Sequence, residues 1–224
     1  MVALLVVFMN GGSATAQTES PATFTTFADW CLNKAQLAPE ARHTVDVLLE
    51  EAGTQDCDRA DETLTSLRFL TLWDKQIVDL APIGTLTNLT ALDLWANQIA
   101  DLTPLGNLTN LTILHLDYNQ IADLTPLGNL TNLSTLFLNR NAIEDVTPLK
   151  NLTNLSYLHL QGNQIVDVTP LASLTNLSWL DLWDNQIVDV APLASLANLS
   201  WLGLWDNPIS DRTCPLTPEE ICQF

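Results

Sequence analysis

Three aspartates and two histidines are the residues of this chain whose types suggest chemistry. Asp93, Asp117 and Asp181 are carboxylates of the kind that glycoside hydrolases use in pairs, as acid and as base or nucleophile. His115 and His159 carry imidazoles, which bind zinc when three or four ligands surround one ion. Either activity requires that the fold bring these groups within a few ångströms of one another.

The elements that position these residues are repeats of 22 residues. One unit, residues 86–107, reads LTNLTALDLWANQIADLTPLGN. Leu92 and Leu94 are two apart and point to one face of a strand, whereas Asp93 and Trp95 point to the other. No single unit can bury its leucines alone, but stacked units can, so the pattern predicts a solenoid with one parallel strand per repeat. Seven units begin at Leu64, Leu86, Leu108, Leu130, Leu152, Leu174 and Leu196.

The full pattern, L-x-x-L-x-x-L-x-L-x-x-N-x-I-x-x-L-x-P-L, resembles the leucine-rich repeats of the bacterial internalin type, over about residues 64–211. The resemblance implies an α/β fold, a curved right-handed leucine-rich-repeat solenoid with a parallel β-sheet on its concave face. It also implies that the usual function is recognition of another macromolecule. Proline after Thr103 or Thr125 suits a short 3-10 turn on the convex side.

Two polar columns run through the repeats. The asparagines are expected to hydrogen-bond buried backbone groups where each chain turns away from the sheet. The aspartates are expected to accept backbone N–H groups at the next turn, with a calcium-binding ladder as the alternative. Nine N-x-S/T sequons fall in the repeat pattern and are interpreted as structural rather than as glycosylation sites. The columns are Asn97, Asn119, Asn141, Asn163, Asn185 and Asn207, and Asp79, Asp101, Asp123, Asp145, Asp167, Asp189 and Asp211.

The repeat places the two histidines two strands apart, roughly 10 Å, with Phe137 between them. Joint metal ligation is therefore not expected. The three aspartates have no accompanying nucleophile–base pair, and carboxylates in adjacent columns arise easily in so acidic a chain. The sequence predicts no catalytic residue, no metal and no cofactor, and a glycosidase-like enzyme is only the third hypothesis.

Function is expected at the outward strand positions, because the repeat pattern does not dictate them. Four tryptophans, two on each of two adjacent strands, form a predicted slot with Gly203 as floor and Asp181 as its carboxylate. A smaller aromatic patch at the other end includes Phe69, and the alternative for both is cross-strand stacking that only stabilises the sheet. The predicted ligand-binding residues are Trp73, Trp95, His115, Tyr118, Phe137, His159, Trp179, Asp181, Trp183, Trp201 and Trp205.

Both ends of a solenoid need caps. Residues 24–63 are predicted to form a helical N-terminal cap, with one helix from Pro39 to Gly53, and residues 212–224 to form the C-terminal cap. Val45, Leu48, Leu49 and Ala52 follow the spacing of one helix face, which should lie on the first repeat.

The four cysteines are predicted to form disulfides Cys31–Cys57 and Cys214–Cys222, the first tying a helix to the turn that follows the next helix. The stack separates the caps by some 30 Å, too far for a disulfide between them. Four free buried thiols are the alternative.

Residues 1–16 are interpreted as a signal peptide, with an apolar run from Val2 to Met9 and an A-x-A site at Ala14-Thr15-Ala16. No basic residue precedes the run, so a hydrophobic tail is the alternative. Residues 17–23 form a polar leader. The net charge of −18 argues against nucleic acid and anionic membranes as partners.

These observations together predict a monomeric, non-catalytic recognition module, secreted or periplasmic, that binds a protein or peptide on its concave face. A glycan-binding protein that uses the slot formed by Trp179, Trp183, Trp201 and Trp205 is the second hypothesis.

Overall fold

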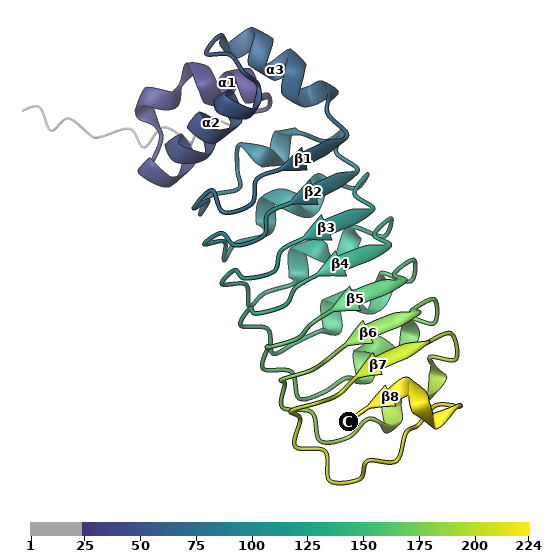
Figure 1. Cartoon of the computed structure of the whole chain (residues 1–224). Coiled ribbons are helices and arrows are strands. Elements are labelled where there is room, and N and C mark those ends of the chain that lie inside the picture. Colours follow the sequence, from purple (N-terminus) through teal and green to yellow (C-terminus); the bar gives the residue numbers. More distant parts are fainter. Residues whose placement is uncertain (1–23) are drawn as a thin grey trace, which may run out of the picture.

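The computed structural model describes residues 24–224, which form one stack of parallel strands with a helical cap at its N-terminal end (Figure 1). The predicted signal peptide and leader lie outside the described residues. Each strand pairs with the strand of the next repeat, so the order in the sheet is the order in the chain. The strands are β1 (Phe69–Thr71), β2 (Ala91–Asp93), β3 (Ile113–His115), β4 (Thr135–Phe137), β5 (Tyr157–His159), β6 (Trp179–Asp181), β7 (Trp201–Gly203) and β8 (Cys222–Gln223).

The leucines form one continuous core behind this sheet. The central leucine of each repeat strand is buried and pairs in register with its counterpart, for example Leu136 with Leu158. The other leucines and isoleucines of each unit meet these from the remaining sides, and most are fully buried. The right-handed leucine-rich-repeat solenoid predicted from the sequence is confirmed.

Short 3-10 helices form the convex side, where most begin at the Thr-Pro or Ala-Pro pair of a repeat. Proline suits the first turn because its missing N–H would have no partner there. The leucine after the proline points into the core and is fully buried, as at Leu149. These helices are η2 (Ile83–Thr85), η3 (Thr103–Asn107), η4 (Thr125–Asn129), η5 (Thr147–Asn151), η6 (Thr169–Ser173) and η7 (Ala191–Ser195).

The asparagine column joins successive repeats. The Asn163 side chain donates to the carbonyls of Leu138 at 3.0 Å and Leu160 at 2.9 Å, and accepts from the N–H of Ile143 at 3.1 Å. Two of these partners belong to the preceding repeat, so each amide connects two coils. In the first repeat Lys75 takes the place of the asparagine, and its own N–H donates to Asn97.

The aspartate column holds the outer turns. Asp145 accepts the backbone N–H of Thr147 at 2.8 Å, and the same bond recurs along the column. Hydrogen bonds from the hydroxyl and backbone N–H of Thr147 hold the pKa of Asp145 below its usual 3.8. This geometry agrees with the predicted turn role. Within residues 24–224 no group of three or more His, Cys, Asp or Glu side chains is placed to hold a metal ion.

A third asparagine column, interpreted from the sequence only as sequons, also links the repeats. Asn154, for example, donates from its side chain to the carbonyl of Thr131 at 2.8 Å, and the equivalent bond recurs in the other repeats. The amide nitrogen of each sequon asparagine in this column is therefore already used in the fold.

Three helices cap the first repeat: α1 (Phe27–Leu32), α2 (Pro39–Glu51) and α3 (Cys57–Ser66). The predicted face of α2 is buried, and Thr44 on this helix donates to the carbonyl of Asp79 at 2.7 Å. Helix α3 was not predicted. Asp56 caps it by accepting the N–H groups of Asp58 and Arg59, and its last turn takes over the opening positions of the first repeat.

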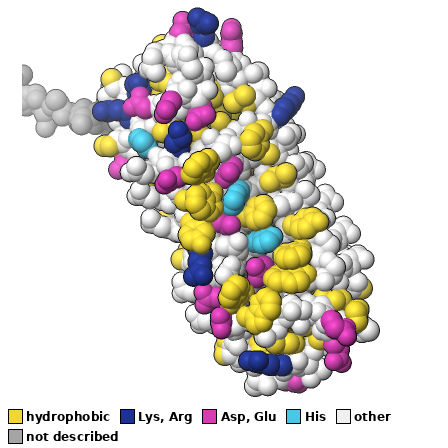
Figure 2. Space-filling view, viewed as in Figure 1, with side chains coloured by type: hydrophobic (Ala, Val, Ile, Leu, Met, Phe, Trp, Pro, Cys, Tyr) yellow, Lys and Arg dark blue, Asp and Glu magenta, His cyan; other side chains and the backbone are white. Residues whose placement is uncertain are grey.

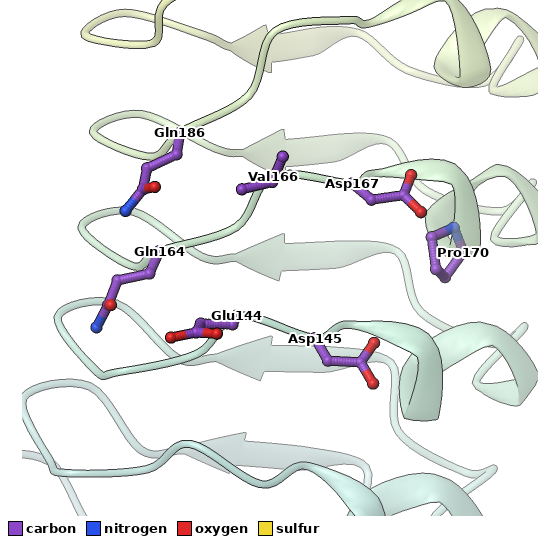
Figure 3. Close-up of a pocket in the computed structure, with 7 residues that line it drawn as sticks. All are labelled: Glu144, Asp145, Gln164, Val166, Asp167, Pro170 and Gln186. Atoms are coloured by element: carbon purple, nitrogen blue, oxygen red, sulfur yellow. The ribbon is translucent and has the colours of Figure 1, made fainter.

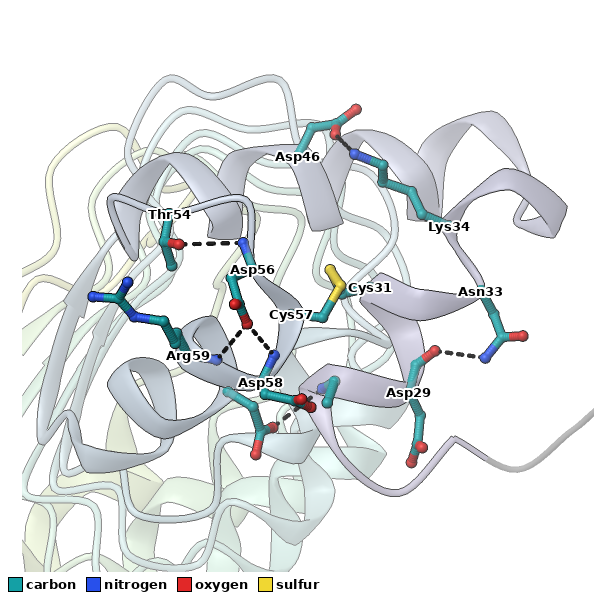
Figure 4. The surroundings of a disulfide bond; sticks show 12 residues. Asp29, Cys31, Asn33, Lys34, Asp46, Thr54, Asp56, Cys57, Asp58 and Arg59 are labelled. Carbon is teal, nitrogen blue, oxygen red and sulfur yellow. Dashed lines mark hydrogen bonds and ion pairs between the residues drawn. A yellow bond between two sulfur atoms is a disulfide. The ribbon is translucent and has the colours of Figure 1, made fainter.

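Both predicted disulfides are present in the structure. Cys31 of α1 bonds to Cys57, with Cα atoms 5.6 Å apart, so the bond joins two helices rather than a helix and a turn (Figure 4). Cys214 bonds to Cys222 in the C-terminal segment. There β8 adds an eighth strand that the repeat pattern did not predict, with Leu202 opposite Cys222. No helix within residues 24–224 has the length and hydropathy needed to cross a bilayer.

Candidate functional site

A belt of aromatic rings crosses the concave face (Figure 2). We call Trp73, Trp95 and Tyr118 the N-terminal cluster, with neighbouring ring centroids 6.0 and 5.8 Å apart. The central stack is His115, Phe137 and His159, with neighbouring centroids 4.8 Å apart. The C-terminal cluster is Trp179, Trp183, Trp201 and Trp205, and His159 reaches it through Trp179 at 6.3 Å. The sheet thus brings all the predicted aromatic residues onto one face.

The predicted slot in the C-terminal cluster is closed. Trp179 and Trp201 stack with centroids 4.2 Å apart, and the Trp201 ring lies directly over Gly203. The rings of Trp201 and Trp205 are only 6.0 Å apart and tilted by 56°. Two ring faces must stand about 7 Å apart to admit a flat ligand, so no flat ligand fits between Trp201 and Trp205. The expectation of an open slot with Gly203 as its floor was wrong, because the missing side chain leaves room for the neighbouring indole.

The packing of Trp201 on Gly203 yields a testable prediction. In the Gly203→Ala variant the new Cβ would overlap Cη2 of Trp201 and lie 2.9 Å from the Asp181 carboxylate. We expect Trp201 to leave Trp179, the exciton signal of this indole pair to weaken in circular dichroism, and stability to fall by about 1–3 kcal/mol. Gly128→Ala is the matched control, since its Cβ meets only a carbonyl at 3.4 Å. An unchanged spectrum in Gly203→Ala would contradict this packing.

His115 lies between two carboxylates. Its Nδ1 is 3.3 Å from Asp93 and its Nε2 is 3.1 Å from Asp117. Asp117 is buried and also accepts the backbone N–H and the side-chain amide of Asn139, at 2.6 and 3.1 Å. Asn139 in turn accepts from the N–H of Gln161, so this chain of bonds fixes the middle of the concave face.

Burial shifts the two ionisable groups at the other end of the central stack. It lowers the pKa of His159 below 6.5, against the pull of the Asp181 and Asp117 charges, which favours the neutral imidazole. Burial likewise raises the pKa of Asp181 above 3.8, although Asp181 accepts the N–H of Trp183. A carboxyl with a raised pKa is a common feature of general acids. The Asp181 carboxyl is buried by the sheet and by Trp201, which packs over the neighbouring Gly203. Its hydrogen bond to the Trp183 N–H stabilises the backbone.

The structure does not assemble the candidate acids into a catalytic pair. Asp117 is saturated by His115 and Asn139, and Asp93 and Asp181 each accept a backbone N–H two residues ahead. Each carboxylate therefore has a role in holding the backbone at the ends of the strands.

A hollow of about 470 Å³ lies beside the N-terminal cluster, where the cap meets the first repeat. It is lined by Glu51, Thr71, Trp73, Asp74 and Lys75, and Lys75 pairs with Glu51 at 3.4 Å. Trp73 and Tyr118 both stay more than half exposed. This end of the belt is open to a ligand, in contrast to the closed C-terminal slot.

The turns at the strand ends add residues that were not predicted to bind. Asp206 accepts the indole N–H of Trp183 at 2.7 Å, and Arg140 crosses Gly162 to reach Asp184 at 3.4 Å. Asp184 and Asp206 have left-handed backbones with φ of 55° and 54°. That conformation turns their side chains toward neighbouring coils. The simple alternation of side chains along a strand does not predict this direction.

A separate hollow of about 390 Å³ lies on the outer turns, between Asp145 and Asp167 (Figure 3). Similar hollows recur between Asp79 and Asp101, and between Asp189 and Asp211. A feature that recurs with the repeat follows from its turn geometry, so we place the candidate site on the concave face instead.

Comparison with known proteins agrees with this architecture. The family model described as leucine-rich repeats (2 copies) matches residues 65–107, 109–151, 131–173 and 153–195. An internalin C2 of Listeria monocytogenes is 36% identical, with a TM-score of 0.60 over 79% of this chain and 88% of that one. The chain belongs to the internalin-type leucine-rich-repeat proteins.

Two other solved leucine-rich-repeat proteins are similar over smaller shares of their own length. An internalin F of Listeria monocytogenes is 33% identical with a TM-score of 0.61, covering 86% of this chain and 62% of its own. A leucine-rich-repeat protein of Leptospira interrogans is 28% identical with a TM-score of 0.61, covering 68% of this chain and 46% of its own. No curated protein matches the sequence. Leucine-rich-repeat folds of the internalin type are generally protein-interaction modules.

Proposed function

We propose that this leucine-rich-repeat protein is a non-catalytic, extracytoplasmic recognition module that binds a protein or peptide on its concave face. The observation that carries the proposal is the aromatic belt, whose side chains lie outside the leucine core. Phe69, Trp73 and Tyr118 expose more than half of their surface, and Trp183 and Trp205 more than a third. Exposed tryptophan and tyrosine are the side chains that most often dominate binding energy at interfaces.

Two further features support the proposal, one for the compartment and one for the kind of ligand. Both disulfides of the structure would persist in an oxidising compartment such as the periplasm or the medium. The closed C-terminal slot also takes away the gap on which a glycan-binding function was based, which favours a protein ligand that lies across the rings.

The proposal predicts which variant loses its ligands. We expect tagged wild-type protein to retain specific proteins from culture medium and envelope extract, and the Trp183→Ala/Trp205→Ala variant to retain them about 30-fold less tightly, measured by quantitative pull-down. Val166→Ala/Val188→Ala is the control, because both valines are exposed on the outer side, away from the belt.

If all three proteins retain the same set, the concave face is not the binding surface. A loss of stability in the tryptophan variant without a loss of ligands would mean that the rings only stabilise the sheet. Thermal unfolding of each variant separates these outcomes.

A further inference from the structure

The concave face carries an excess of negative charge. Six carboxylates occupy its strand and turn positions, Asp74, Asp93, Asp117, Asp181, Asp184 and Asp206. Arg140 is the one lysine or arginine at these positions, and it forms an ion pair with Asp184. Burial lowers the pKa of His159, which disfavours a positive charge on this imidazole. The field over this face therefore attracts cations and repels anions.

Carboxylates and exposed rings lie together at both ends of the belt. At the N-terminal cluster Asp74 follows Trp73, and both line the hollow against the cap, where the charge of Lys75 is paired with Glu50 and Glu51. At the C-terminal cluster Asp206 holds the indole N–H of Trp183, so the carboxylate lies at the edge of that ring. A guanidinium group fits such a pair, since it stacks on an aromatic face and binds a carboxylate through two N–H groups. A lysine ammonium is more strongly hydrated and lacks the planar fork.

We propose that the ligand of the concave face is an extended, arginine-bearing segment of a partner protein, an inference that rests on the proposed function. The segment lies along the stack and places one arginine at each aromatic cluster. The clusters are about four strands apart, from β2 to β6, which is about 20 Å, and an extended chain covers that distance in about six residues.

The test uses a synthetic serine–glycine peptide with two arginines about six residues apart, beside lysine and glutamate versions of the same peptide. Binding to the full chain is measured by fluorescence of the concave tryptophans at low salt. The variant is Asp74→Asn/Asp206→Asn, which neutralises the carboxylate at each aromatic cluster. Asparagine tolerates the left-handed backbone of both positions, and at position 206 it keeps an acceptor for the indole N–H of Trp183. The matched control is Asp145→Asn/Asp167→Asn on the outer turns, which changes the net charge by the same amount.

We expect the arginine peptide to bind more tightly than the lysine peptide, and the glutamate peptide not to bind. The concave variant should lose about tenfold in affinity, and the outer variant less than about twofold. Equal losses in both variants would mean that only the overall acidity attracts the peptide, and no binding of the arginine peptide would reject the proposal outright. If the pull-down retains only neutral or acidic proteins through Trp183 and Trp205, this inference fails while the proposed function stands.

Discussion

Replacing Asn163 by alanine should lower the free energy of unfolding by about 3–5 kcal/mol, measured by urea denaturation. The Asn163 side chain is buried and makes hydrogen bonds to the carbonyls of Leu138 and Leu160 and to the N–H of Ile143. Alanine leaves the buried N–H of Ile143 without an acceptor, which costs about 1–3 kcal/mol. The two carbonyls keep a donor from Asn141 and from Asn185, so each loses only one of its two side-chain hydrogen bonds, at about 0.5–1.5 kcal/mol.

Asn154→Ala in the same repeat is the matched control. Its side chain is exposed and donates one hydrogen bond, to the carbonyl of Thr131, so the loss should stay near 1 kcal/mol. Because each repeat contacts only its neighbours, the damage from Asn163→Ala should appear first in the flanking coils, as faster amide exchange there. Equal losses in the two variants would mean that water replaces the buried amide.

The core and both structural columns could be predicted from the sequence because the repeat has a strict period. A strand directs Leu92 and Leu94 to one side whatever its neighbours are, and stacking then buries them. The asparagine and aspartate columns follow from the same period, since a polar group at a fixed turn position meets the same backbone groups in every coil. Such inferences need no knowledge of side-chain conformation.

At the candidate site, the side-chain conformations could not be predicted from the sequence. The period predicts Trp201 and Trp205 on one strand with outward side chains. In the structure β7 ends at Gly203 and Trp205 lies in the turn that follows, with its ring still beside that of Trp201. The period did not determine that the Trp201 ring would lie over Gly203 and close the slot, because that depends on which rotamer packs best. Gly203 is the one residue in its column without a side chain, so the signal was present, but it was interpreted as a floor for a ligand.

The two ends of the solenoid were harder to predict because the period stops there. Helix α3 begins inside the segment expected to be a turn, although Asp56 is a good N-cap and the residues after it favour a helix. Strand β8 is only two residues long and carries none of the leucines of the repeat. It forms because β7 offers an unpaired edge, which is a property of the assembled sheet rather than of the local sequence.

Removing the Cys31–Cys57 disulfide should destabilise the cap by about 3–4 kcal/mol. The two residues are 26 apart in the chain, and the entropy that a cross-link removes from the unfolded state grows with that separation. In the Cys31→Ala/Cys57→Ala variant we expect α1 to lose its hold on α3 and Phe27 to leave the core, in which it is fully buried. Amide exchange should then rise in α1 and α3 before it rises in the central repeats.

Cys214→Ala/Cys222→Ala provides the comparison, because that bond spans only 8 residues and should contribute about 1 kcal/mol less. The two variants also act at opposite ends of a stack in which each coil is stabilised by its neighbours. Loss of the first bond should therefore expose the core at β1, and loss of the second the core at β7, with the central stack of His115, Phe137 and His159 intact in both. If the cap of either variant unfolded together with the central repeats, at the midpoint of the wild-type protein, the disulfides would not be what stabilises the caps.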